Sequence, residues 1–127
     1  MWEKLKKDVK KMVDKKHELE TQYRAQRDMH IEVLAKMAAD LIQSDIFKSV
    51  RMFDQNYLRI YTCGSVHVDN TFKDVSFGEH MDMIDDRIRR NVPDWVNIIN
   101  VLPFGYNSAN CTLVVDYTIN EAKVCAE

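Results

Sequence analysis

Residues 2–42 read WEKLKKDVKKMVDKKHELETQYRAQRDMHIEVLAKMAADLI, and this stretch decides the fold because it contains neither Gly nor Pro. Its apolar residues recur at alternating steps of three and four, the spacing of one face of an α-helix. With Trp2 at heptad position a, apolar side chains recur at positions a and d over five heptads, as in a coiled coil. We call this row the seam, and its apolar members are Trp2, Leu5, Val9, Met12, Leu19, Tyr23, Val33 and Met37.

The seam is imperfect and changes character along its length. Polar side chains interrupt it at Lys16, Gln26 and His30, which weakens association but restricts register and oligomer number. We therefore expect residues 1–28 to form a projecting or oligomerising helical segment, and residues 29–127 to form a single α+β domain. The expected body-facing stripe of the helix is wider than the seam and comprises Ile31, Val33, Leu34, Met37, Ala38, Leu41 and Ile42.

After Ser44 the pattern changes to that of short strands. Ser49–Asp54 and Tyr57–Thr62 resemble the two strands of a hairpin, and Val66–Asp69 resembles a third strand. A small antiparallel meander is the expected arrangement of these three segments.

A second helix and a closing hairpin are expected in the last fifty residues. Ser76 and Glu79 have the spacing of a capping box, and the apolar residues that follow predict a short helix over 77–90. Trp95–Leu102 and Cys111–Ile119 are rich in β-branched and aromatic residues and predict a long hairpin. The tail from Asn120 is expected to fray. The fold class is therefore α+β: a long, partly coiled-coil-like N-terminal helix packed on a small antiparallel sheet of four or five strands, with a second short helix.

Composition describes an ordinary folded domain with an uneven distribution of charge. The chain has 127 residues, 46% of them apolar and 30% charged, and its net charge is −2. Residues 1–16 hold seven Lys against three acidic residues, or +4, which leaves −6 for the remainder. Clustered Lys is the electrostatic footprint of nucleic-acid binding. One alternative function is therefore nucleic-acid binding through Lys4, Lys7 and Lys11.

The cysteines and the N-terminus both indicate the cytoplasm. Cys63, Cys111 and Cys125 are widely spaced and form no C-x-x-C pair, so neither a disulfide framework nor a zinc module is expected. Charges interrupt every apolar run before a signal peptide or a membrane span could form. We expect no membrane partner.

Little in the sequence supports catalysis. It contains no G-x-S-x-G, no P-loop and no G-x-G-x-x-G, so we expect neither an enzyme nor a cofactor. His67, Asp69 and His80 could in principle supply ligands for a divalent metal, and a metal-dependent hydrolase built on them is a further alternative. Because no helical metal-binding signature accompanies these residues, no metal site is predicted.

The loop 103–110 combines aromatic and amide side chains around Gly105, a composition used by recognition loops. Together with the seam, it predicts a small intracellular protein–protein interaction module that acts by occupying a partner's surface or by forming a homodimer. Regulators, inhibitors and assembly factors meet this description. A viral accessory protein would also meet it, but no residue points specifically to that class. The predicted partner-binding residues are Leu5, Val9, Met12, Leu19, Tyr23, Phe104, Tyr106, Asn107 and Asn110.

Overall fold

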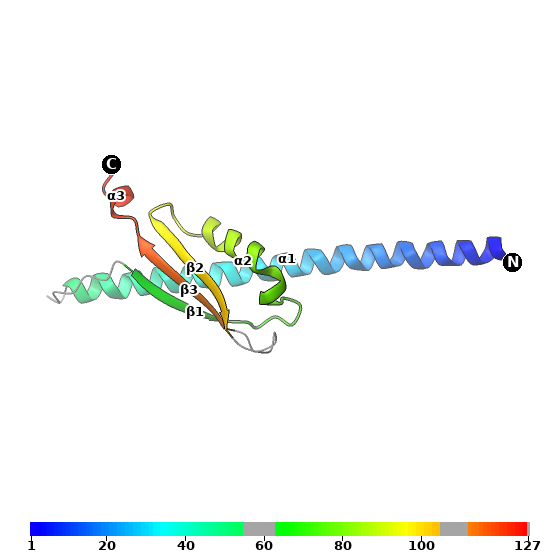
Figure 1. Ribbon diagram of the computed structural model, residues 1–127, viewed down its shortest axis with the longest axis horizontal. Helices are drawn as coiled ribbons and strands as arrows, with labels where there is room; N and C mark the ends of the chain where they lie inside the picture. The colour runs from blue at the N-terminus through cyan, green and yellow to red at the C-terminus, as the bar shows by residue number, and fades with distance from the viewer. Residues whose placement is uncertain (55–62, 105–111, 127) are drawn as a thin grey trace.

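The computed structural model describes residues 1–54, 63–104 and 112–126, and shows a long rod with a small body on one half of it (Figure 1). This is an α+β fold with a long N-terminal helix, as the sequence predicts. The elements in chain order are α1 (Trp2–Asp54), β1 (Cys63–Asp69), α2 (Phe77–Arg90), β2 (Val96–Phe104), β3 (Thr112–Ile119) and α3 (Glu121–Val124).

Helix α1 is longer than the apolar pattern indicated. The prediction of a strand over Ser49–Asp54 is wrong, because α1 continues without a break to Asp54. No Gly or Pro occurs before that point, and extending a helix costs less than ending it and nucleating another element. Ser49 even donates its hydroxyl hydrogen to the carbonyl oxygen of Asp45, at 3.2 Å, within the helix. The predicted strand Tyr57–Thr62 lies outside the described residues.

The described strands form one three-stranded antiparallel sheet in the order β1-β3-β2. The predicted hairpin of the last two strands is confirmed, since β2 and β3 are adjacent and antiparallel. Strand β1 pairs with the other side of β3, with Val66 opposite Val115. The register of β2 shifts between Ile98 and Asn100, where a β-bulge re-aims the side chains that follow. The expected meander is wrong in its first segment, because Ser49–Asp54 is helical; in the described sheet the last strand of the chain lies at the centre.

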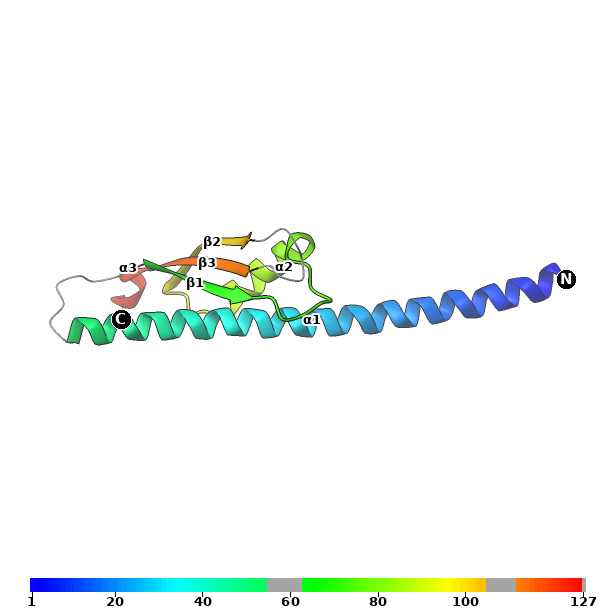
Figure 2. The ribbon, with the colours of Figure 1, turned by 90° about the horizontal axis from the view of Figure 1, so that it is seen from below.

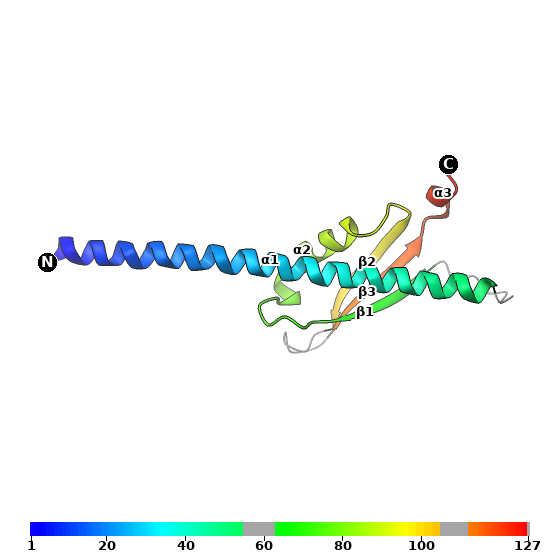
Figure 3. The same cartoon turned by 180° about the vertical axis from the view of Figure 1, so that it is seen from behind.

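Helices α1 and α2 lie on the same face of the sheet, and none of the described helices covers the other face (Figures 2 and 3). The core fills the space between these two layers. Burying the apolar face of each element stabilises the fold by about 25 cal/mol for each Å² removed from water. The buried core residues are Ile31, Leu34, Ala35, Ala38 and Ile42 from α1, Phe77, Ile84 and Ile88 from α2, Val75 before α2, and Val66, Val68, Val96, Ile98, Leu113, Val115 and Tyr117 from the sheet.

The second helix begins and ends where the sequence predicts, at Phe77 and Arg90. Ser76 is its N-cap residue, but the capping-box prediction is wrong in one respect, because the Ser76 side chain makes no cap hydrogen bond. Ion pairs four residues apart lie on the outer side of α2, from Arg89 to Asp85 at 2.6 Å and from Arg90 to Asp86 at 3.0 Å.

Helix α2 is joined to α1 through the Glu32 carboxylate. Arg87 donates to it at 3.2 Å and the Asn91 side-chain amide donates to it at 3.1 Å. These hydrogen bonds lower the pKa of Glu32 below its ordinary value, because they favour the charged form.

The tail contains a short helix that the sequence did not predict. Glu121–Val124 form one helical turn, and Asn120 caps it by accepting the backbone N–H of Lys123 at 3.1 Å. The backbone N–H of Asn120 donates to the carbonyl of Trp95 at 2.7 Å. This bond holds the start of the tail against the body.

Candidate functional site

The first half of α1 projects away from the body as an exposed rod (Figure 1). Every residue from Met1 to Gln26 is exposed, and the first buried residue is Ile31. The division of the chain at residue 28 stays a prediction, although exposure changes close to it. The exposed fractions of five predicted seam residues lie between 44% and 66%; these residues are Leu5, Val9, Met12, Leu19 and Tyr23.

The seam also continues beyond the point where α1 meets its own body. Val33 and Met37 are 40% and 36% exposed, whereas Leu34 and Ala38, their neighbours in the chain, are completely buried. Successive helical residues lie about 100° apart around the axis, so these pairs belong to two separate stripes. The prediction that Val33, Met37 and Leu41 belong to the buried, body-facing stripe is therefore wrong, because these side chains are 40%, 36% and 39% exposed.

A short loop before α2 meets α1 where the projecting part of the helix begins. We call residues 70–75 the 70–75 loop. The Tyr23 hydroxyl donates to the backbone carbonyl of Asp74 at 3.2 Å, and His30 Nδ1 lies 2.8 Å from both carboxylate oxygens of Asp74. The His30 ring stacks on Phe72 with centroids 4.1 Å apart. His30, which in the sequence was only an interruption of the seam, is therefore the residue at which the body first covers it.

The 70–75 loop is itself held in shape by Asn70. The side-chain amide of Asn70 donates to the carbonyl of Val75 at 2.8 Å, and its side-chain oxygen accepts the backbone N–H of Phe72 at 2.9 Å. No signal in the sequence connects this loop to Tyr23 and His30, which lie 51 and 44 positions before Asp74. Sequence analysis therefore missed Phe72 and Asp74 as neighbours of the seam.

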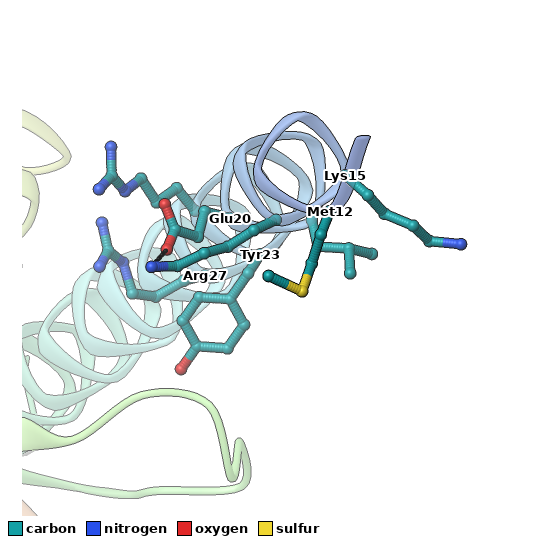
Figure 4. A pocket seen from close by; sticks show the side chains of 8 residues that line it. Met12, Lys15, Glu20, Tyr23 and Arg27 are labelled. Atoms are coloured by element: carbon teal, nitrogen blue, oxygen red, sulfur yellow. Dashed lines mark ion pairs between the residues drawn. The ribbon is translucent and has the colours of Figure 1, made fainter. Parts of the chain in front are cut away.

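An open groove of about 670 Å³ runs along the seam between Met12 and Arg27 (Figure 4). Its apolar floor comes from Met12, Leu19 and the ring of Tyr23. In Figure 4 the Tyr23 side chain points toward the ribbon of the loop before α2. Lys16, the polar seam residue in the middle of the groove, places its ammonium nitrogen 3.8 Å from Glu20. The charge of Lys16 thus lies beside the seam, while its aliphatic stem remains available for apolar contact.

The predicted recognition loop is described only at its start. Phe104 is the last residue of β2 and is 58% exposed. It pairs with Thr112, next to the buried Leu113, so it lies on the sheet face away from α1. The seam and Phe104 therefore lie on different sides of the molecule. Tyr106, Asn107 and Asn110 lie outside the described residues.

The lysines of the nucleic-acid alternative lie on the projecting rod. Lys4, Lys7 and Lys11 are all exposed, and their spacing of three and four residues places them on one side of the helix. Seen along the helix axis, this side is turned away from the seam. The basic and apolar surfaces of the rod are therefore separate.

The residues of the metal alternative are not gathered in the structure. Among the described residues, no group of three or more His, Cys, Asp or Glu side chains could hold a metal ion. Asp69 accepts a hydrogen bond from the Thr112 hydroxyl at 2.9 Å. His80 Nδ1 lies 3.0 Å from the backbone oxygen of Ser76, and His67 is exposed on β1. These three side chains therefore do not converge on a common site.

A smaller depression of about 270 Å³ lies between α1 and the segment that leads into β2. Its walls include Ile42, Ile46, Val92 and Trp95, and Asp40 is the one ionisable residue among its lining residues. General acid–base or nucleophilic catalysis needs several convergent polar groups, and this depression does not supply them.

Comparison of the chain with protein-family models, curated proteins and solved structures found no match. In the part of the chain that the structure describes, no helix has the length and apolar character needed to cross a membrane. The function is therefore inferred from the residues of this chain and their geometry.

Proposed function

We propose that this protein is a non-enzymatic protein–protein interaction module that binds through the exposed seam of α1. One observation carries the proposal: a regular apolar row runs along the part of α1, from Met1 to Gln26, in which every residue is exposed. Soluble monomers rarely expose contiguous apolar surface of this kind, and such surface usually marks an interaction site.

The lack of packing along the projecting rod supports the same proposal. An isolated helix gains little from backbone propensity, and most helical stability in proteins comes from packing an apolar face. The seam from Leu5 to Tyr23 lacks such packing, except where Tyr23 meets the 70–75 loop. A partner helix laid on the seam would supply the missing contacts and would stabilise the rod as it binds.

The proposal places the protein in the cytoplasm as a regulator, an inhibitor or an assembly factor. Cys63 and Cys125 are free and exposed, a state that a reducing compartment preserves. Occupying a partner's surface requires no chemistry from the module itself, in keeping with the scattered polar groups described above.

The test uses a charge-introducing variant and a matched control. Leu5→Asp with Met12→Asp places two carboxylates in the seam, and we expect the mass measured by light scattering to fall to that of one chain, or capture of a partner protein to be lost. The control, Thr21→Asp with Ala25→Asp, adds the same charge to the same helix at heptad positions f and c, on the side away from the seam. Association that is unchanged in the first variant, or equally reduced in the control, would refute a role for the seam.

Nucleic-acid binding remains a second candidate because Lys4, Lys7 and Lys11 share one exposed side of the rod. It predicts an affinity for duplex or single-stranded probes that falls steeply with salt. Reversing the three lysines to Glu would abolish this binding, whereas binding through the apolar seam would be nearly insensitive to the change.

A further inference from the structure

We infer that the occupant of the seam is a second copy of this chain, with the two α1 helices antiparallel and overlapping over residues 2–26. This inference rests on the proposed function, because it names the partner and the orientation for the same surface. The observations that carry it are the position of the 70–75 loop, the residues beside the seam, and the distribution of charge along the rod.

The 70–75 loop limits how far a partner helix can follow the seam. His30 is stacked on Phe72 and paired with Asp74, so the seam is closed to a partner at that position. Tyr23, one heptad earlier, touches the loop with its hydroxyl but is still 51% exposed. The open part of the seam therefore extends from Trp2 to Gln26.

An antiparallel pair that uses this whole length has one natural register. Position a of one helix then faces position d of the other, and the residue numbers of these a–d pairs add up to 28, whereas those of the flanking e–e and g–g pairs add up to 26 and 30. Leu5 faces Tyr23 of the second copy, Val9 faces Leu19, and each of these contacts occurs twice by symmetry. The N-terminus of each copy ends beside the 70–75 loop of the other, where the open seam ends.

The flanking residue Val13 distinguishes the two orientations. It is 38% exposed and occupies heptad position e, beside the seam. In a parallel pair position e faces position g of the partner five residues earlier, so Val13 would face Asp8. In the antiparallel register position e faces position e, so Val13 meets Val13 of the second copy. Only the antiparallel pair covers apolar surface with apolar surface at this position.

The polar seam residue Lys16 favours the same orientation. In a parallel pair position a faces position a, so two Lys16 side chains would meet inside the interface. In the antiparallel register Lys16 faces Met12 of the second copy, a pliable apolar side chain against which a lysine stem can pack. The Lys16 ammonium already reaches outward to Glu20 at 3.8 Å, so burying its stem leaves the charge in solvent.

Charge along the rod is also better matched in the antiparallel pair. Residues 1–16 carry +4, whereas residues 17–28 carry three acidic and two basic side chains, or −1. Parallel helices with axes 8–10 Å apart would place the two basic ends side by side, within about one Debye length. Antiparallel helices move each basic end toward the acidic part of the other and bring Lys6 next to Glu20. One unfavourable pair remains, between the two Lys15 side chains at the centre.

Distance measurement between spin labels tests the orientation. Glu3→Cys is labelled in full-length protein whose Cys63, Cys111 and Cys125 are replaced by Ser. In the antiparallel register residue 3 lies level with residue 25 of the second copy, so 22 residues at 1.5 Å separate the labels by about 33 Å along the axes. A parallel pair places them on helices whose axes are about 10 Å apart.

The possible outcomes separate this inference from the proposed function. A distance near 33 Å supports the antiparallel pair. A short distance with dimer mass would overturn the orientation but keep the seam as an interaction surface. Monomer mass at high concentration would exclude the second copy as occupant, and the Leu5→Asp, Met12→Asp variant would then decide through partner capture whether the seam binds a different protein.

Oxidative cross-linking tests the register independently. In the same Cys-free background, Val13→Cys is expected to form a disulfide-linked dimer readily, because the two residues at position 13 face each other across the interface. The matched control is Asp14→Cys, whose side chain lies on the outer side of the helix. Equal cross-linking of both variants, or none with Val13→Cys in a confirmed dimer, would overturn the register.

Discussion

Replacing Leu34 and its neighbour Val33 by Ala, one at a time, provides the sharpest test of how α1 is oriented on the sheet. Leu34 is completely buried between α1 and the sheet, whereas Val33 is 40% exposed on the seam. The two residues are adjacent in the chain, similar in chemistry and both helical. The main difference between them is the direction in which the side chain leaves the helix.

The expected magnitudes follow from burial. Leu→Ala at a buried position costs about 2–5 kcal/mol, from lost transfer free energy and the cavity that remains. The rigid helix α1 cannot collapse into this cavity, so we expect Leu34→Ala to lower the free energy of unfolding by about 3 kcal/mol. For a chain of this size that corresponds to about 10–15 °C in Tm. Val33→Ala loses less buried surface and gains helix propensity, so its effect should stay within about 0.5 kcal/mol.

Urea unfolding followed by tryptophan fluorescence measures both effects. Trp95 packs against the core and reports its exposure, while Trp2 is 83% exposed and adds a nearly constant signal. Val33 lies outside the proposed overlap of residues 2–26, so self-association does not confound the comparison. Equal destabilisation by the two variants, or a larger effect of Val33→Ala, would refute the assignment of the two stripes of α1.

Two further predictions concern stability. Gly64→Ala would place a methyl group inside contact distance of the Asp45 carboxylate, so we expect a loss of about 1–3 kcal/mol in chemical unfolding. Its matched control, Gly78→Ala, meets nothing closer than 3.9 Å and should be neutral or stabilising by up to about 1 kcal/mol; a greater loss in the control would contradict this account. The lowered pKa of Glu32 means that its ionised form, hydrogen-bonded to Asn91 and Arg87, contributes stability above the ordinary pKa of 4.5. That contribution is lost as pH falls below 4.5 through the lowered value, so Glu32→Gln should flatten the acid side of a plot of Tm against pH, and an unchanged slope would contradict the assignment.

Local sequence patterns correctly predicted the elements that are formed by residues close together in the chain. The bounds of α2 follow from apolar residues at helical spacing and from Pro93, which stops the run. The hairpin of β2 and β3 follows from two β-branched segments close together in the chain. The strand predicted over Ser49–Asp54 failed because β-branched and aromatic residues also continue an existing helix when no breaker intervenes.

The candidate site was only partly accessible from sequence. Five seam residues from Leu5 to Tyr23 were singled out by heptad spacing, and the structure places all five on the exposed rod. The closure of the seam at His30 depends on Phe72 and Asp74, more than forty residues away, and no local pattern encodes such a contact. Because of this closure, the structure bounds the surface that a partner could occupy.

By itself, the sequence determined that this chain begins with a long helix bearing an apolar row, because helical periodicity and the absence of breakers act over a few neighbouring residues. Only the tertiary structure decided which stripe of that helix faces the sheet, since Val33 and Leu34 are both apolar and only packing distinguishes them. The strand order β1-β3-β2 was likewise decided by pairing between distant segments. Such pairing depends on long-range contacts that outweigh local preference.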